Sequence, residues 1–281
     1  MISWCPISVS VSAFSAVTYL DSIIAHHRAR AHGDVRDIQQ LCAQAKARRQ
    51  VHAQPAQIFS QALTRRSTLA VIAEVKRRSP SKGDIAIDLD PTKLVGDYVA
   101  GGACCVSVLT DTPHFGGSAE DLMAVRATTS LPILRKDFTV SLRDVYDAGI
   151  MGADAVLLIV AALSDHELHA FHQAAGEVGL DVLMEVHDEL EVERALAVGA
   201  TLIGVNQRDL HTFAVDGDRA VRVARAIPTG VIAVAESGIA GPNDARRCAD
   251  AGYKAVLVGE HLVRSGDRVK ALRDLQVVLP S

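Results

Sequence analysis

The sequence predicts an α/β fold, a (β/α)8 TIM barrel with one or two extra N-terminal helices. Eight short apolar runs recur between residues 69 and 259 and alternate with longer amphipathic segments, which is typical of parallel strands joined by crossover helices. Polar residues stand at the carboxyl ends of these runs, where barrel enzymes build their sites. No G-x-G-x-x-G follows the first run, which weakens the alternative of an open, doubly wound sheet that binds a dinucleotide.

The expected strands are short and apolar, and they lie at residues 69–75, 104–110, 132–136, 154–160, 181–186, 201–206, 230–236 and 254–259. Between them, Ser164 and Glu167 have the spacing of a helix capping box, and Gly179 and Gly199 fit positions just beyond helix ends. Residues 17–50 predict one or two further helices before the first strand. These helices could cover the base of the barrel or lean over its mouth, and the sequence leaves both positions open.

The length and composition of the chain indicate how many domains it has and which classes of partner it can bind. The chain has 281 residues, 49% of them hydrophobic, and a formal net charge of −4. An α/β barrel of this length is routinely one domain, so residues 18–281 are expected to form a single domain and residues 1–17 a disordered or loosely docked extension. The mild acidity argues against a nucleic-acid surface, and no run is long enough to predict a transmembrane helix.

The cysteines and the N-terminal residues indicate the cellular compartment of the protein. Five cysteines, without a C-x-x-C or a Cys/His cluster at zinc spacing, are expected to be reduced thiols. The apolar start lacks a positively charged region and is interrupted by Pro6, which argues against a signal peptide. We therefore expect a cytoplasmic protein without membrane contact.

Charged and amide side chains follow one strand after another, at Glu74, Lys76, Lys136, Glu185, Asn206, Arg208 and Glu236. Glu74 and Lys76 are two residues apart, so they share one face of a strand. Lysines and glutamates on one concave face shift one another's proton affinities, which suits acid–base catalysis. We find neither a Ser/His/Asp arrangement nor a metal-binding trio at these positions, and His166, His169 and His172 are expected to face solvent.

Two glycine-containing loops predict a phosphate site. Ser237 and Gly238 follow the seventh strand and Gly259 follows the eighth, the usual phosphate position of this fold. His261 lies beside it and is expected to point outward. Near the strand ends, apolar surface that would suit a flat ring comes from Phe115, Phe138, Leu157 and Leu210.

Several motifs in order carry a family resemblance: IAEVKRRSPSKG, SVLTDTPHFGGS, PILRKDF, ADAVLLIV, LMEVHDE, GVNQRDLHTF, AESGI and VLVGE. Over about residues 18–275 the chain resembles indole-3-glycerol phosphate synthases of tryptophan biosynthesis. The resemblance implies no metal or organic cofactor. It implies a sugar-phosphate substrate, 1-(2-carboxyphenylamino)-1-deoxyribulose 5-phosphate, which loses CO2 and water to give indole-3-glycerol phosphate. Transient contact with other tryptophan-pathway enzymes is a further expectation.

The same resemblance implies residue roles. Lys136 matches the principal general acid, Glu185 a carboxylate that acts in dehydration, and Lys76 with Glu74 a second lysine and its neighbour. The resemblance implies further polar substrate contacts for Asn206, Arg208, Glu236 and Ser237. It implies that the pocket around the aromatic ring and the ribulose is formed by Ser79, Pro80, Ser81, Phe115, Phe138, Leu157 and Leu210. It implies phosphate binding for Gly238 and Gly259. Which lysine serves which step stays open, because coupled groups share protons.

Two rival functions compete with this assignment. Phosphoribosylanthranilate isomerase, another phosphate-binding barrel of the pathway, calls for a cysteine–aspartate pair at the strand ends, whereas the first strand here offers Glu74 and Lys76. A catalytically silent paralogue that binds sugar phosphates would be favoured by loss of Lys136, Lys76 or Glu185, and all three are present.

Overall fold

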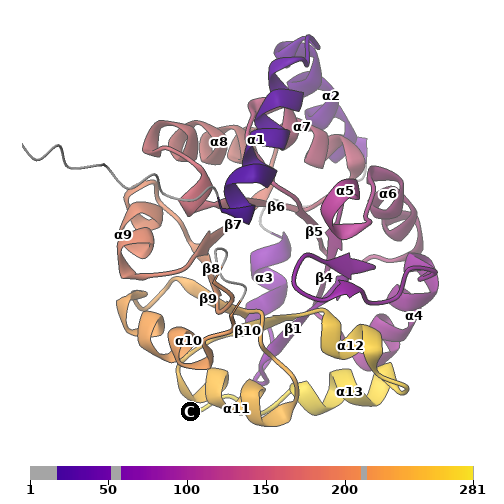
Figure 1. Cartoon of the computed structure of the whole chain (residues 1–281), viewed down its shortest axis with the longest axis vertical. Coiled ribbons are helices and arrows are strands. Elements are labelled where there is room, and N and C mark those ends of the chain that lie inside the picture. The colour runs from indigo at the N-terminus through magenta and orange to yellow at the C-terminus, as the bar shows by residue number, and fades with distance from the viewer. Residues whose placement is uncertain (1–17, 52–57, 210–213, 281) are drawn as a thin grey trace, which may run out of the picture.

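Eight parallel strands form a closed barrel in the order β1-β10-β9-β8-β7-β6-β5-β4, which confirms the predicted fold class (Figure 1). The computed structural model describes residues 18–51, 58–209 and 214–280. Each expected strand is present within two residues of its expected bounds. The strands are β1 Ala70–Val75, β4 Cys105–Leu109, β5 Ile133–Lys136, β6 Ala155–Ile159, β7 Asp181–Val186, β8 Leu202–Asn206, β9 Ile232–Glu236 and β10 Ala255–Val258.

Helices surround the barrel on its outside, as the ring of coiled ribbons in Figure 1 shows. They are α4 Pro91–Gly101, α5 Thr112–Phe115, α6 Ala119–Thr128, α7 Leu142–Met151, α8 Asp165–Glu177, α9 Glu189–Ala197, α10 Gly217–Val223, α11 Pro242–Asp250, α12 Glu260–Arg264 and α13 Arg268–Leu275, with 3-10 turns at Val160–Ala162 and Ala224–Ala226. Ser164 and Glu167 form the expected capping box of α8. Gly179 and Gly199 have φ angles of 75° and 85°, a left-handed conformation that glycine adopts without strain just beyond a helix end.

Of the helices predicted within residues 17–50, one leans over the mouth and the other packs on the outer helices, whereas the base is covered by a further helix at residues 58–64 that the sequence did not predict. α1 (Tyr19–His32) leans over the mouth of the barrel, where Tyr19, Leu20 and Ile23 reach the central cavity. α2 (Ile38–Val51) packs on α7. α3 (Ile58–Thr64) closes the opposite end, because its Phe59 and Leu63 are buried among the inward-facing side chains of the strands.

The core has two layers because each strand is buried on both faces, which explains the near-continuous apolar runs. Inside the barrel, Ile72, Leu134 and Leu183 pack with Phe59 of α3. Between strands and helices, a larger cluster surrounds the barrel. Phe59 is fully buried, and burial of such a side chain stabilises the fold by roughly 1.5–3 kcal/mol.

The loop after β1 is more regular than a plain loop. Strands β2 (Arg78–Ser79) and β3 (Gly83–Asp84) pair antiparallel around a turn at residues 80–82, and Gly83, the first residue of β3, has a φ of 64°. This small hairpin brings residues 79–82 to the cavity wall. Pro80 and Gly83 therefore belong to a structured element at the rim of the cavity.

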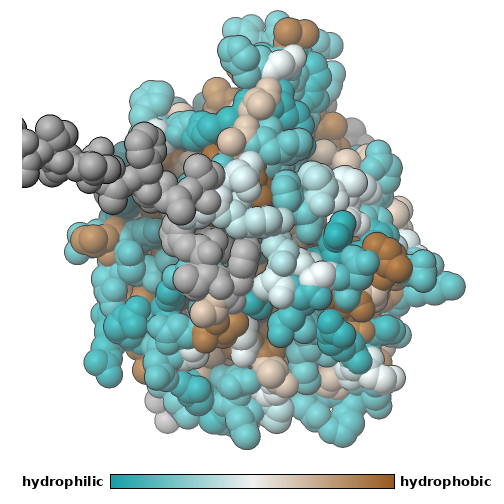
Figure 2. Space-filling model, viewed as in Figure 1, coloured by the Kyte–Doolittle hydropathy of each residue, from teal (hydrophilic) through white to brown (hydrophobic). Residues whose placement is uncertain are grey.

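The prediction that His166, His169 and His172 face solvent is confirmed only in part. His166 and His169 are exposed on α8, whereas His172 is half-buried, and burial lowers its pKa. On the face shown in Figure 2, hydrophobic residues are scattered among hydrophilic ones over the outer helices. Within the three described ranges, no helix is both long and apolar enough to span a bilayer.

Candidate active site

A cavity of about 690 Å³ opens at the carboxyl ends of the strands, with part of its wall supplied by α1 and the β2–β3 hairpin. Every predicted site residue in the described part of the chain lines it, and Leu210 lies outside the described residues. The predicted residues that line it are Glu74, Lys76, Ser79, Pro80, Ser81, Phe115, Lys136, Phe138, Leu157, Glu185, Asn206, Arg208, Glu236, Ser237, Gly238 and Gly259.

Lys136 stands at the centre of a buried ionic cluster. Its Nζ lies 2.8 Å from Glu185 Oε2 and 3.3 Å from Glu236 Oε2. The three residues come from β5, β7 and β9, alternate strands that point side chains into the barrel at the same height. Burial opposes the charge on Lys136, but the negative charges of Glu185, Glu236 and Glu74 outweigh it and raise its pKa. Lys136 is therefore a cation and a hydrogen-bond donor at neutral pH.

The two glutamates beside Lys136 have opposite proton affinities. Burial raises the pKa of Glu185, but Lys136 and hydrogen bonds outweigh burial and lower it; one of these bonds is donated by Asn206 Nδ2 at 3.0 Å. Burial dominates at Glu236 and raises its pKa to about 8, and its Oε1 has no hydrogen-bond partner among the described residues. At neutral pH the cluster holds one carboxylate and one protonated carboxyl group, the separation that acid–base chemistry requires.

This separation predicts a pH dependence of stability. Between its ordinary pKa of 4.5 and the raised value of about 8, Glu236 binds a proton in the folded state that the unfolded chain lacks. The free energy of unfolding therefore decreases as pH rises across that window. The stabilising contribution of Glu236 is fully present below pH 4.5 and is lost once the pH passes the folded pKa. We expect Glu236→Gln to remove this decrease. Urea unfolding of both proteins from pH 5 to about 9 measures it.

A matched control for that titration is Glu193→Gln, since Glu193 is exposed on α9. The control is expected to keep the wild-type dependence on pH. A Glu236→Gln curve that runs parallel to the wild-type curve at every pH would contradict the raised pKa of Glu236.

Lys76 and Glu74 form a second ion pair at the end of β1, with Lys76 Nζ 2.5 Å from Glu74 Oε1. Gly259 faces this pair: a Cβ atom there would lie 2.5 Å from Glu74 Oε1 and 3.1 Å from Lys76 Nζ. The glycine after β10 therefore also provides the space that the ion pair occupies. The same holds for Gly204 on β8, because its missing side chain leaves room for Glu236. Gly204 opens the motif GVNQRDLHTF, but the sequence assigned it no role.

The remaining walls combine apolar and polar groups. The rings of Phe115 and Phe138 lie 6.2 Å apart and form an aromatic side of the cavity. After β9, Ser237 and Gly238 have φ angles of 63° and 73°, and Gln207 Nε2 donates a 2.7 Å hydrogen bond to the Ser237 carbonyl. This sharp turn brings backbone from the β9 loop into the cavity wall.

Sequence reasoning missed several residues of the cavity wall, including Tyr19, Leu20, Ile23, Lys82 and Arg264. The first three belong to α1, whose position the sequence left open. Lys82 and Arg264 are cations that line the same cavity as the predicted phosphate glycines, and they were missed because neither stands at the end of a barrel strand. His261 is half-buried and lines the cavity, so the expectation that it points outward is wrong.

A closed (β/α)8 barrel with a buried lysine–glutamate cluster at the carboxyl ends of its strands defines an acid–base enzyme of the barrel class. The comparisons narrow this class. The family model described as indole-3-glycerol phosphate synthase matches residues 20–275, and the chain belongs to that family.

Curated relatives support the assignment over most of the chain. An indole-3-glycerol phosphate synthase of Nocardioides sp. is 56% identical over 204 residues, which cover 73% of this chain and 78% of the relative. Another, from Mycolicibacterium gilvum, is 45% identical over 92% of this chain and 94% of its own length. Among solved structures, a thiamine phosphate pyrophosphorylase from Pyrococcus furiosus matches with a TM-score of 0.55 at 16% identity, over 74% of this chain and 94% of its own; this likeness concerns the fold alone.

Proposed function

We propose that the cavity converts 1-(2-carboxyphenylamino)-1-deoxyribulose 5-phosphate to indole-3-glycerol phosphate, with release of CO2 and water. The observation that carries this proposal is Lys136, a buried cation held between an ionised Glu185 and a protonated Glu236 beside an aromatic wall. The reaction is a carboxy-lyase reaction in which each step moves a proton or breaks a bond that such groups assist.

In ring closure, the aromatic carbon that carries the carboxylate attacks the substrate's ketone carbon. Negative charge then develops on the ketone oxygen, and the Lys136 ammonium donates a hydrogen bond and then a proton to that oxygen. A cation in a pocket that excludes water stabilises this charge far more than a solvated one, because the surrounding dielectric is low. Glu185 and Glu236 hold the ammonium in place during the step.

Decarboxylation and dehydration follow. As CO2 leaves, the electron pair of the broken C–C bond returns to the ring. The new hydroxyl then departs as water, which requires an acid at its oxygen and a base for the proton that the closing ring loses. Glu185 is the ionised carboxylate of the cluster and fits the base, while the acid is a lysine or the protonated Glu236.

The cavity walls fit the parts of this substrate. Phe115, Phe138 and Leu157 offer apolar contact to the carboxyphenyl ring. Arg208 lines the same cavity, and a guanidinium is suited to hold the carboxylate before it leaves. The loops with Gly238 and Gly259 would take the phosphate.

The direct test is an indole-fluorescence assay of the purified protein with the carboxyphenylamino-deoxyribulose phosphate. We expect turnover to a fluorescent indole product together with release of one CO2 for each product molecule. Binding of a non-reacting substrate analogue without any turnover would overturn the proposal and identify the silent sugar-phosphate-binding paralogue instead.

Two finer expectations remain proposals that rest on the family alone. They are a cytoplasmic location and transient contact with other enzymes of tryptophan synthesis.

A further inference from the structure

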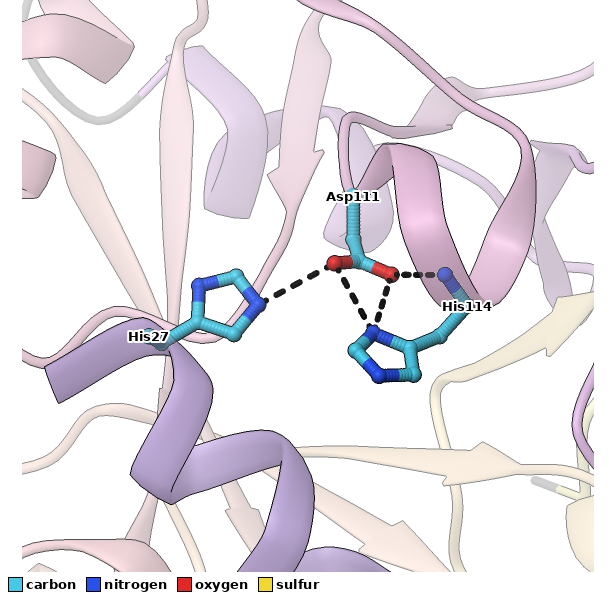
Figure 3. Close-up of side chains that lie close together, drawn as sticks. All are labelled: His27, Asp111 and His114. Atoms are coloured by element: carbon cyan, nitrogen blue, oxygen red, sulfur yellow. Dashed lines mark hydrogen bonds and ion pairs between the residues drawn. The ribbon is translucent and has the colours of Figure 1, made fainter. Parts of the chain in front are cut away.

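Three side chains from two separate parts of the chain converge beside the cavity (Figure 3). They are His27 on α1, Asp111 just after β4, and His114 on α5. His27 Nε2 lies 3.1 Å from Asp111 Oδ1, and His114 Nδ1 lies 3.2 Å and 3.0 Å from the two oxygens of the same carboxylate. His27 and Asp111 are 1% and 2% exposed, and His114 is half-buried.

The donor atoms of the three residues all lie within 4.8 Å of one another. A zinc-like ion lies about 2.0–2.2 Å from each imidazole nitrogen or carboxylate oxygen, which places neighbouring ligand atoms about 3.4 Å apart in a tetrahedral site. The histidine–aspartate separations of 3.0 to 3.2 Å are within a few tenths of an ångström of that spacing, and the two imidazole nitrogens lie within 4.8 Å of each other. Small side-chain shifts would therefore admit an ion between the three groups.

The carboxylate of this cluster is held ready to ligate. The His27 ring contacts Oδ1 of Asp111, and the His114 ring contacts both of its carboxylate oxygens. The carboxylate also accepts a 2.9 Å hydrogen bond from the backbone N–H of His114. Asp111 is thus oriented before any ion arrives.

We propose that His27, Asp111 and His114 form a binding site for a divalent transition-metal ion of the zinc type, outside the catalytic cavity. Two imidazoles and one carboxylate are a ligand set that such ions prefer, with a fourth position left for water. Mg²⁺ and Ca²⁺ favour oxygen ligands, so the two imidazole nitrogens select against them.

Bound metal would join α1 to the α5 turn at the rim of the cavity. The His27 ring lies 5.2 Å from the Phe138 ring, and α1 carries Tyr19, Leu20 and Ile23 into the cavity wall. The ion would therefore steady the helix that leans over the mouth. This role is structural and does not depend on the proposed reaction.

The expected affinity is moderate. A ligating histidine usually donates its second ring N–H to a partner, yet His27 Nδ1 has no hydrogen-bond partner in the described part of the chain. We therefore expect dissociation constants on the order of micromolar, weaker than those of closed structural zinc sites with four protein ligands.

The experiment is equilibrium dialysis of the full chain against Zn²⁺, with Co²⁺ as a visible-absorption probe of the same site. We expect one equivalent to bind the wild type, and His27→Gln and His114→Gln each to weaken binding at least about tenfold. His166→Gln is the matched control, because His166 is exposed on α8 and contributes no atom to the cluster. The control is expected to bind Zn²⁺ as the wild type does, and Mg²⁺ is expected not to displace Co²⁺.

Equal Zn²⁺ binding by the wild type and His114→Gln would overturn the proposal, as would a wild type that binds no Zn²⁺ at millimolar concentration. A loss in His166→Gln as large as in His114→Gln would also overturn it, because the ion would then occupy surface histidines. His27 is buried, so His27→Gln could fail to fold. In that case His114→Gln decides, since its half-buried side chain tolerates the change better.

Discussion

Substitution of Lys136 by alanine is expected to lower kcat for indole formation by about 10³-fold or more. Removal of a single donor from a developing oxyanion costs about 10²–10³ in kcat, and loss of general acid catalysis costs a similar factor. Lys136 combines both tasks in the proposed reaction, and Glu185 and Glu236 lie within 3.3 Å of its Nζ. Steady-state fluorescence kinetics with the carboxyphenylamino-deoxyribulose phosphate measures the change.

Two variants separate chemistry from folding in this experiment. Lys136→Met keeps most of the side-chain volume without the charge, so it should lose activity as Lys136→Ala does while packing better. Lys46→Ala removes an exposed lysine from α2 and should leave kcat unchanged. Ring closure by Lys136→Ala within tenfold of the wild-type rate would show that another group polarises the ketone, Lys76 being the first to examine.

The barrel and most of its site could be predicted because two local signals agree. Strands buried on both faces leave continuous apolar runs in the sequence, and a charge at the end of such a run needs a partner or a task. Glu74, Lys136, Glu185 and Glu236 each stand at such an end, and parallel topology brings these ends to one face. Residues that are far apart in the chain but all stand at the carboxyl end of a strand could therefore be assigned to one site from the sequence.

The parts that could not be predicted depend on tertiary placement. Nothing in the pattern of α1 or α3 tells which end of the barrel each covers, so Tyr19 and Phe59 could not be assigned to the mouth or to the base. Asp111 and His114 are three residues apart, but His27 joins them only because α1 leans over the mouth. Gly204 likewise has a role only once β9 places Glu236 beside it.

Gly204→Ala is expected to lower kcat by about 10²-fold while the protein stays folded. A Cβ atom at this position would lie 2.0 Å from Glu236 Oε1 and 3.2 Å from Leu183 Cδ1, so the carboxyl group of Glu236 must move by more than an ångström. The atom that yields is the end of a side chain rather than backbone, which is why the fold survives. The movement disturbs the 3.3 Å contact with Lys136, and misplacement of about 1 Å in a catalytic cluster can cost about 10²-fold in rate.

A double variant tests whether the effect passes through Glu236. In the Glu236→Ala background the clashing oxygen is absent, so adding Gly204→Ala should cause no further loss of kcat. Gly176→Ala on α8 is the matched control, because a Cβ there meets no heavy atom within 4 Å and activity should be unchanged. A loss in the double variant that equals the product of the two single losses would mean that the alanine acts elsewhere in the barrel. No further loss would place Gly204 among the residues that position Glu236 against Lys136, since a missing side chain on β8 then determines where the carboxyl group of β9 lies.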